Sequence, residues 1–315
     1  MNTPTRITTF VALLALVFAG AAFAGSQLDP GVEEKSGHED PAVTHSEEAA
    51  GHDAATSPDA EHGESHGAPA SATPPGLASE AGGLRLVVAD PMVEPVPGAP
   101  VEFAVVGRDG RTVREFDVTH ERRMHLIVVR RDFQGFQHLH PDQRPDGSWE
   151  VELDEAGPGT HRMFADFSTG GKPLTLATDL LVPGDFEPRP LGPARSTASA
   201  GDGYEVTIDS PPGRAGETID TEFEIRKAGE PVAVQPYLGA DGHLVALREG
   251  DQAFLHTHPE GKAGGEGPIR FGVTYPSVGR YRLYLQFRHA GEVRTAEFTR
   301  VAGPEPRHGG DDHGH

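Results

Sequence analysis

The feature that most constrains the fold of this chain is an internal repeat. The segment MHLIVVRRDFQGFQHLHPD at residues 124–142 aligns without a gap on GHLVALREGDQAFLHTHPE at residues 242–260. Further along, GTHRMFADF at residues 159–167 matches GRYRLYLQF at residues 279–287. A shift of 118 residues is too long for the unit of a solenoid, so it indicates two duplicated domains.

Short strand-like runs fill both copies. WEVEL at residues 149–153 and IRFGVT at residues 269–274 are typical: they carry β-branched and aromatic residues and have Gly, Pro or Asp nearby. No stretch has a helical period over ten residues or more. The sequence therefore predicts an all-β protein with two tandem immunoglobulin-like or cupredoxin-like β-sandwich domains.

Composition sets the expected domain boundaries. The sandwiches are predicted at residues 83–182 and 203–302, joined by a linker rich in Pro, Ser and Ala at residues 183–202. Residues 25–82 and 303–315 are rich in His, acidic residues and Gly, and such segments cannot bury enough apolar surface to order. We expect disordered tails that either collect metal ions weakly or serve only as solubilising segments.

The N-terminus predicts export. Residues 1–24 contain Arg6, the apolar run FVALLALVF at residues 10–18 and an A-x-A site at residues 22–24, as in a secretory signal peptide. An uncleaved N-terminal anchor is the alternative. We expect a secreted or periplasmic protein with no membrane span after signal removal.

Composition also excludes several classes of site and partner. The chain has no cysteine, which rules out disulfides, iron–sulfur clusters, thiolate zinc sites and a blue-copper centre. The formal net charge of −21 argues against a nucleic-acid partner.

Histidines in the first copy are spaced for a shared face. If residues 132–133 form the centre of a hairpin turn, His125 lies directly across from His140, with Cβ atoms about 5 Å apart. His138 is then the diagonal neighbour at about 7–8 Å. His120, five residues before His125, is expected in a preceding loop as a further ligand. Imidazole suits Cu and Zn, so we expect a site for copper first and zinc second.

The second copy repeats this arrangement without the additional histidine. With residues 250–251 at the turn centre, His243 faces His258, and His256 is the diagonal neighbour. If only one copy binds metal, we expect the first. The faces that carry the histidines also carry apolar residues, expected to form a floor beneath the ligands: Ile127, Val129 and Phe136 in the first copy, Val245, Leu247 and Phe254 in the second. Met124 and Met163 are interpreted as core residues and not as thioether ligands.

The two histidine segments, together with LATDLLV at residues 176–182 and YPSVGRYRLYLQF at residues 275–287, resemble a family of exported bacterial proteins with YtkA-like or heavy-metal-binding-type β-sandwich domains. The resemblance covers roughly residues 84–302. It implies an extracytoplasmic domain found beside copper and heavy-metal handling systems. It also implies metal-handling exported or membrane proteins as partners, with the histidines named above as ligands.

Three classes of function stay open at this point. The first is a metal-binding protein that buffers or delivers copper. The second is a structural or interaction protein whose histidines serve packing and turns. An enzyme is the least favoured, because the sequence has no Gly-x-Ser-x-Gly, Walker-type or His-Glu-x-x-His motif.

Overall fold

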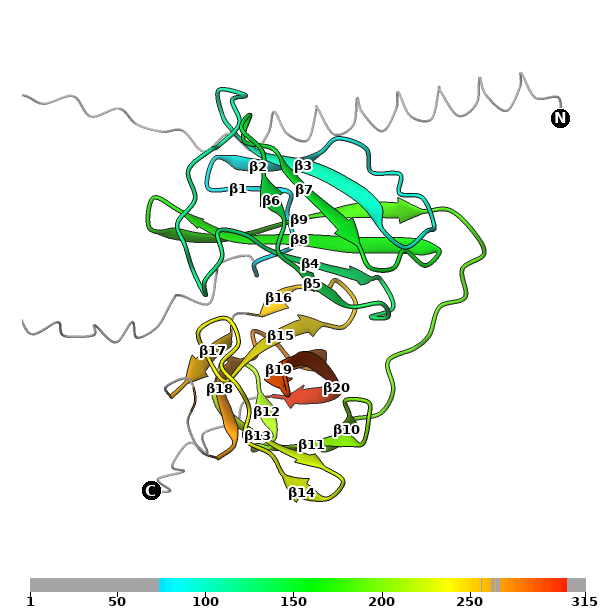
Figure 1. Ribbon diagram of the computed structural model, residues 1–315, viewed down its shortest axis with the longest axis vertical. Helices are drawn as coiled ribbons and strands as arrows, with labels where there is room; N and C mark the ends of the chain where they lie inside the picture. The colour runs from blue at the N-terminus through cyan, green and yellow to red at the C-terminus, as the bar shows by residue number, and fades with distance from the viewer. Residues whose placement is uncertain (1–73, 256, 262–263, 265–266, 305–315) are drawn as a thin grey trace, which may run out of the picture. The chain divides into compact units, whose positions relative to one another are not determined.

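The computed structural model describes residues 74–255, 257–261, 264 and 267–304. Within these residues every regular element is a β-strand, which confirms the all-β class (Figure 1). The same residues include no helix with the length and apolar character needed to cross a membrane. The expected signal peptide, most of the N-terminal tail and the C-terminal tail from residue 305 lie outside the described residues.

The first repeat is built from two sheets in its described residues. One has the order β1-β2-β3-β7-β6 and the other the order β5-β4-β8-β9. The strands of the first sheet are β1 (Glu80–Ala81), β2 (Leu84–Val88), β3 (Ala99–Gly107), β7 (Trp149–Leu153) and β6 (Asp142–Gln143). Those of the second are β5 (Gln137–Leu139), β4 (His125–Arg130), β8 (Gly159–Thr169) and β9 (Lys172–Val182).

The second repeat has the same plan. One sheet has the order β10-β11-β13-β18-β17, with β14 also pairing β13, and the other the order β12-β20-β19-β15-β16. The strands of the first sheet are β10 (Thr197–Ser199), β11 (Tyr204–Asp209), β13 (Thr218–Lys227), β14 (Glu230–Pro231), β18 (Ile269–Thr274) and β17 (Thr257–Glu260). Those of the second are β12 (Gly213–Arg214), β20 (Glu292–Gly303), β19 (Gly279–His289), β15 (Gly242–Arg248) and β16 (Phe254–Leu255).

The strand order identifies both repeats as immunoglobulin-like sandwiches. In the first repeat β2, β3, β7 and β6 take the A, B, E and D positions of that fold, and β5, β4, β8 and β9 take the C′, C, F and G positions. In the second repeat β11, β13, β18 and β17 face β16, β15, β19 and β20 in the same way. The prediction of two tandem sandwiches is confirmed.

Alternation along the strands builds a core inside each sandwich. In β3, Ala99, Val101, Phe103 and Val105 are buried, because successive side chains of a strand point to opposite faces. Trp149, Met124 and Met163 join the same core, so both methionines are core residues as expected. In the second repeat Phe223 of β13 packs in the corresponding core.

The central strands β4 and β15 are buried on both faces. From β4, Leu126 and Val128 enter the core of the first repeat, whereas Ile127 and Val129 enter a third apolar cluster. This cluster contains residues of both repeats: Ile127, Val129, Phe133, Phe164, Ala177, Leu191, Val245, Leu247, Phe254 and Tyr284, with Phe136 packed against them. The residues expected to form a separate apolar floor in each copy therefore pack in one shared cluster.

The hairpin register calculated from the sequence is the register of the structure. Leu126 pairs with Leu139 and Ile127 with His138 in the first repeat. In the second, Ala246 pairs with Leu255 and Leu247 with Phe254. The second ladder ends sooner than expected, because the chain continues into β17, which belongs to the opposite sheet.

Two expected boundaries differ from the structure. Residues 74–82 were assigned to the N-terminal tail, but they pack against the first repeat. The guanidinium of Arg162 donates to the carbonyl oxygens of Gly76 and Leu77 at 3.0 and 2.8 Å, and β1 pairs with β2. The expected linker contains β10, and its Leu191 is buried in the shared apolar cluster. Backbone pairing and one buried leucine order segments whose composition alone predicts flexibility.

Candidate metal centre

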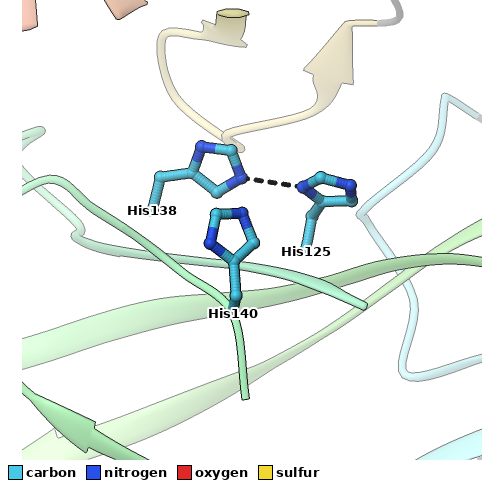
Figure 2. A group of neighbouring side chains, drawn as sticks. All are labelled: His125, His138 and His140. Atoms are coloured by element: carbon cyan, nitrogen blue, oxygen red, sulfur yellow. Dashed lines mark hydrogen bonds between the residues drawn. The ribbon is translucent and has the colours of Figure 1, made fainter. Parts of the chain in front are cut away.

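Three of the expected ligands converge in the first repeat. Ring nitrogens of His125, His138 and His140 all lie within 4.8 Å of one another. Figure 2 shows the three rings grouped around a common space. His125 and His138 are buried and His140 is half-buried. In the described part of the chain this is the one group of His, Asp or Glu side chains close enough to hold an ion.

The backbone explains why these rings meet. His125 begins β4, and β4 pairs with β5, which contains His138. His140 follows the last residue of β5, at the point where the chain crosses to β6 in the opposite sheet. Its position still continues the hairpin register, so it lies across from His125, and the ring centroids of the two are 5.2 Å apart.

Hydrogen bonds indicate which nitrogens of two rings carry protons. Nε2 of His125 donates to the carbonyl oxygen of Thr119 at 3.1 Å. Nδ1 of His138 lies 2.7 Å from Oε1 of Gln286, whose amide nitrogen in turn lies 3.4 Å from the Thr295 hydroxyl. With a proton on each of these outer nitrogens, a neutral imidazole has a lone pair on its other nitrogen.

The two remaining nitrogens face each other. Nδ1 of His125 and Nε2 of His138 are 3.0 Å apart, and a dashed line marks this interaction in Figure 2. In this tautomeric state neither has a hydrogen to donate, so two lone pairs converge in a buried space. Nε2 of His140 is also buried, and it has no hydrogen-bond partner among the described residues. A cation between the rings would satisfy these nitrogens.

Burial keeps the rings neutral. It lowers the pKa of His138 to about 3, with a smaller contribution from the neighbouring His125 and His140. Burial, followed by the nearby His125, lowers the pKa of His140 to about 4. Burial also lowers the pKa of His125. Since only neutral imidazole can ligate a metal, the cluster is available for ligation at neutral pH.

The other predicted ligands are distributed differently. His120 is exposed in the loop before β4, with its ring centroid 6.1 Å from that of His125. His243 lies beside the first-repeat cluster: its ring centroid is 4.5 Å from that of His138 and 5.6 Å from that of His125. His258 lies on β17 and pairs with Gly272 of β18, in the sheet opposite the one that contains His243. His256 is outside the described residues.

The sequence reasoning missed two groups that orient the rings. One is the carbonyl of Thr119, and the other is Gln286, which belongs to the second repeat. Gln286 is the residue paired with His243 across β15 and β19. The signal for it was available, because Gln286 lies in the repeated segment GRYRLYLQF, but its contact with His138 depends on packing between the repeats.

Comparison with known families gives two matches along the chain. Residues 80–184 and residues 197–303 each match the family model described as "Domain of unknown function (DUF8832)". The chain belongs to this family. It carries the domain twice, in agreement with the repeat seen in the sequence. Membership in DUF8832 assigns no activity, and the resemblance to YtkA-like and heavy-metal-binding-type proteins stays a prediction.

No curated protein matches the chain at a significant level. Among solved structures, the adhesin InvE of Yersinia pseudotuberculosis is 11% identical, with 69% of this chain and 58% of that chain covered and a TM-score of 0.21. The Escherichia coli adhesin FdeC is 16% identical, with 70% and 64% covered and a TM-score of 0.23. The D00–D0 domain of intimin is 12% identical, with 70% and 99% covered and a TM-score of 0.23. The match thus spans less than two thirds of InvE and of FdeC, and similarities at these TM-scores carry no further argument.

Proposed function

We propose that this chain is an exported, non-enzymatic protein that binds a transition metal, copper first and zinc second, and buffers it or delivers it to metal-handling exported or membrane proteins. The proposed ligands are His125, His138 and His140. The observation that supports this most directly is the pair of buried nitrogens, Nδ1 of His125 and Nε2 of His138, that face each other 3.0 Å apart. Export itself rests on the signal-like residues 1–24.

The spacing suits a single ion. With metal–nitrogen distances of about 2.0–2.1 Å, two nitrogens 3.0 Å apart subtend about 95° at the metal. An ion so bound lies about 3.2 Å from each ring centroid, so ligand angles of about 90–112° separate the centroids by about 4.5–5.3 Å. The measured separations within the cluster are 4.8, 5.2 and 5.3 Å.

The surroundings have the usual features of a metal site. Ligating histidines commonly donate their outer N–H to a carbonyl or carboxylate, which fixes the ring orientation and raises ligand basicity. Here the outer nitrogens of His125 and His138 meet the carbonyl of Thr119 and the amide of Gln286. An all-imidazole donor set suits copper and zinc better than magnesium or calcium, which prefer oxygen.

The alternative function is a structural or interaction protein without metal. In the cluster it requires the proton of His138 on Nε2 instead of Nδ1. If Gln286 presents its NH₂ group to Nδ1 of His138, then Nε2 of His138 carries the proton and donates to Nδ1 of His125. A metal-free chain of hydrogen bonds then runs from Gln286 to Thr119. Nitrogen-15 NMR of the histidine rings in the metal-free protein distinguishes the two tautomers of His138.

The deciding experiment is titration of the full chain with Cu(II), Cu(I) and Zn(II) in the presence of a competing chelator, which removes metal held weakly by the tails. We expect one chelator-resistant equivalent in the wild type, and its loss in His138→Gln and in His140→Gln. The matched control is His289→Gln, because His289 bonds the Tyr204 hydroxyl and takes no part in the cluster. Unchanged stoichiometry in both cluster variants would refute the metal proposal and favour the structural alternative.

A further inference from the structure

The candidate metal centre borders residues of the second repeat. His243 on β15 and Gln286 on β19 are Cα partners in adjacent strands. Gln286 bonds Nδ1 of His138 at 2.7 Å, and the ring of His243 has its centroid 4.5 Å from that of His138. Two neighbouring side chains of the second repeat therefore contact the same histidine of the first.

The duplication explains this juxtaposition. The shared apolar cluster contains Ile127 together with its equivalent Val245, and Val129 together with its equivalent Leu247. Each repeat thus contributes the same face of its C-strand region, as in an isologous contact between two identical subunits. His125 and His243 are also equivalent positions, one residue before these runs, and their rings stack at an interplanar angle of 11° with centroids 5.6 Å apart.

His243 lies near enough to become a fourth ligand of the same ion, although its ring nitrogens do not belong to the group of nitrogens formed by His125, His138 and His140. Because the rings of His125 and His243 are nearly parallel, the His243 side chain has to turn before one of its nitrogens faces the ion. For an ion about 3.2 Å from each ring centroid, separations of 4.5 and 5.6 Å from His138 and His125 correspond to ligand angles of about 90° and 120°. Both angles are ordinary for four-coordinate copper or zinc. His120, at 6.1 Å from His125 and from His243, would need an angle near 145° and is exposed, so it fits less well.

We propose that His243 completes the ligand set and that the bound ion is shared by the two repeats, so that metal binding stabilises their contact. This inference rests on the proposed function, since it needs an ion at His125, His138 and His140. It goes beyond that function because it makes the domain pair, and not one domain, the metal-binding unit. Release of the ion to a partner would then loosen the contact between the repeats.

The aromatic residues give each repeat its own spectroscopic probe. The single tryptophan, Trp149, is buried in the first repeat, and all five tyrosines lie in the second. Unfolding of the full chain is followed by Trp149 fluorescence and by tyrosine near-UV circular dichroism, with and without Zn(II), an ion without redox chemistry. An ion held by the first repeat alone stabilises chiefly the Trp149 transition, whereas a shared ion also raises the tyrosine midpoint.

The test variant is His243→Gln, with His289→Gln as the second-repeat control. Loss of an outer-sphere partner already weakens metal sites by about 10–100-fold, so loss of a direct ligand should weaken Zn(II) binding by at least about tenfold. We also expect the zinc-dependent shift of the tyrosine midpoint to disappear in His243→Gln. Electron paramagnetic resonance of the Cu(II) form should change from four coupled nitrogens to three. The urea midpoint of the metal-free variant checks that it is folded.

The possible failures are distinguishable. If His138→Gln loses the metal but His243→Gln keeps wild-type affinity and nitrogen count, this inference is overturned and the proposed function stands. If the wild type retains none of the three ions against the chelator, both are overturned. If zinc raises the tyrosine midpoint equally in the wild type and in His243→Gln, the coupling passes through the apolar cluster alone, and the shared ligand is refuted.

Discussion

Acidification should destabilise the metal-free protein through His138. In the folded protein burial lowers the pKa of this ring from 6.5 to about 3, whereas the unfolded chain has the ordinary value. Between these two pH values the unfolded state binds a proton that the folded state does not. Stability is therefore highest above pH 6.5 and falls as the pH decreases toward 3.

The magnitude follows from the difference in pKa. Each pH unit within this window costs the folded state about 1.4 kcal/mol, so His138 alone should remove about 2 kcal/mol between pH 7.5 and pH 5. Burial also lowers the pKa values of His125, His140 and His243, so the total loss should be larger. Even the contribution of His138 alone is a substantial fraction of a typical domain's margin of about 5–15 kcal/mol.

The assay is urea unfolding at pH 7.5 and pH 5 in the presence of EDTA, followed by Trp149 fluorescence. The comparison is with His138→Leu, which is less stable at both pH values but lacks the titrating ring. We expect the wild type to lose about 2 kcal/mol more on acidification than the variant does. Equal losses in both proteins would show that His138 is accessible or already protonated when folded, and the argument from two facing lone pairs would fail with it.

Three further predictions concern the partners of the cluster and the apolar contact. Gln286→Leu removes the group that orients His138 and should weaken the chelator-resistant metal by about 10–100-fold; unchanged affinity would exclude an orienting role. Tyr284→Phe removes the hydroxyl that donates to the carbonyl of Phe133 at 2.8 Å and should cost about 1 kcal/mol in urea unfolding, and a neutral result would contradict that bond. Leu247→Ala truncates a fully buried side chain and should lower the free energy of unfolding by about 2–5 kcal/mol in calorimetry, unlike a surface leucine.

The sequence predicted the local part of the site because strand pairing obeys a simple periodicity. Once the turn of the first copy is placed at residues 132–133, the pairing of Ile127 with His138 follows by counting, and the structure has that pairing. The same counting gave Leu247 opposite Phe254 in the second copy. The core residues could be predicted in the same way, because buried and exposed positions alternate along β3.

Counting paired residues from the turn failed where the chain leaves the ladder of the second hairpin. After Leu255 the second hairpin ends, and β17 pairs with β18, so His258 lies opposite Gly272 and not opposite His243. Nothing in the segment LHTHPE distinguishes a strand that continues from one that crosses to the other sheet. In the first copy the chain crosses at nearly the same point, but β4 begins at His125 and His140 remains within reach of it.

The packing between the repeats is reflected in the sequence by a run of apolar residues in each copy, which we interpreted differently. Residues 126–129 and 244–247 are consecutive apolar residues, whereas a strand with one face in water alternates apolar and polar residues. Such a run indicates burial on both faces, and in the structure the second face of each strand meets the other repeat. We interpreted those residues as a floor beneath two separate sites because a periodicity within one strand does not reveal what covers it.

Duplication followed by face-to-face packing has a consequence for the number of sites. When two copies of one strand pair present the same face to each other, residues near the symmetry axis meet their own equivalents, as His125 meets His243. Under the proposal of a shared ion, two copies of a ligand placed there contribute to one mixed centre and not to two independent ones. The remaining positions are then free to diverge, and Gln286 occupies the place that Asp166 has opposite His125 in the first repeat. A neutral amide at that place accepts a hydrogen bond from Nδ1 of His138 and adds no buried charge that would itself need a partner.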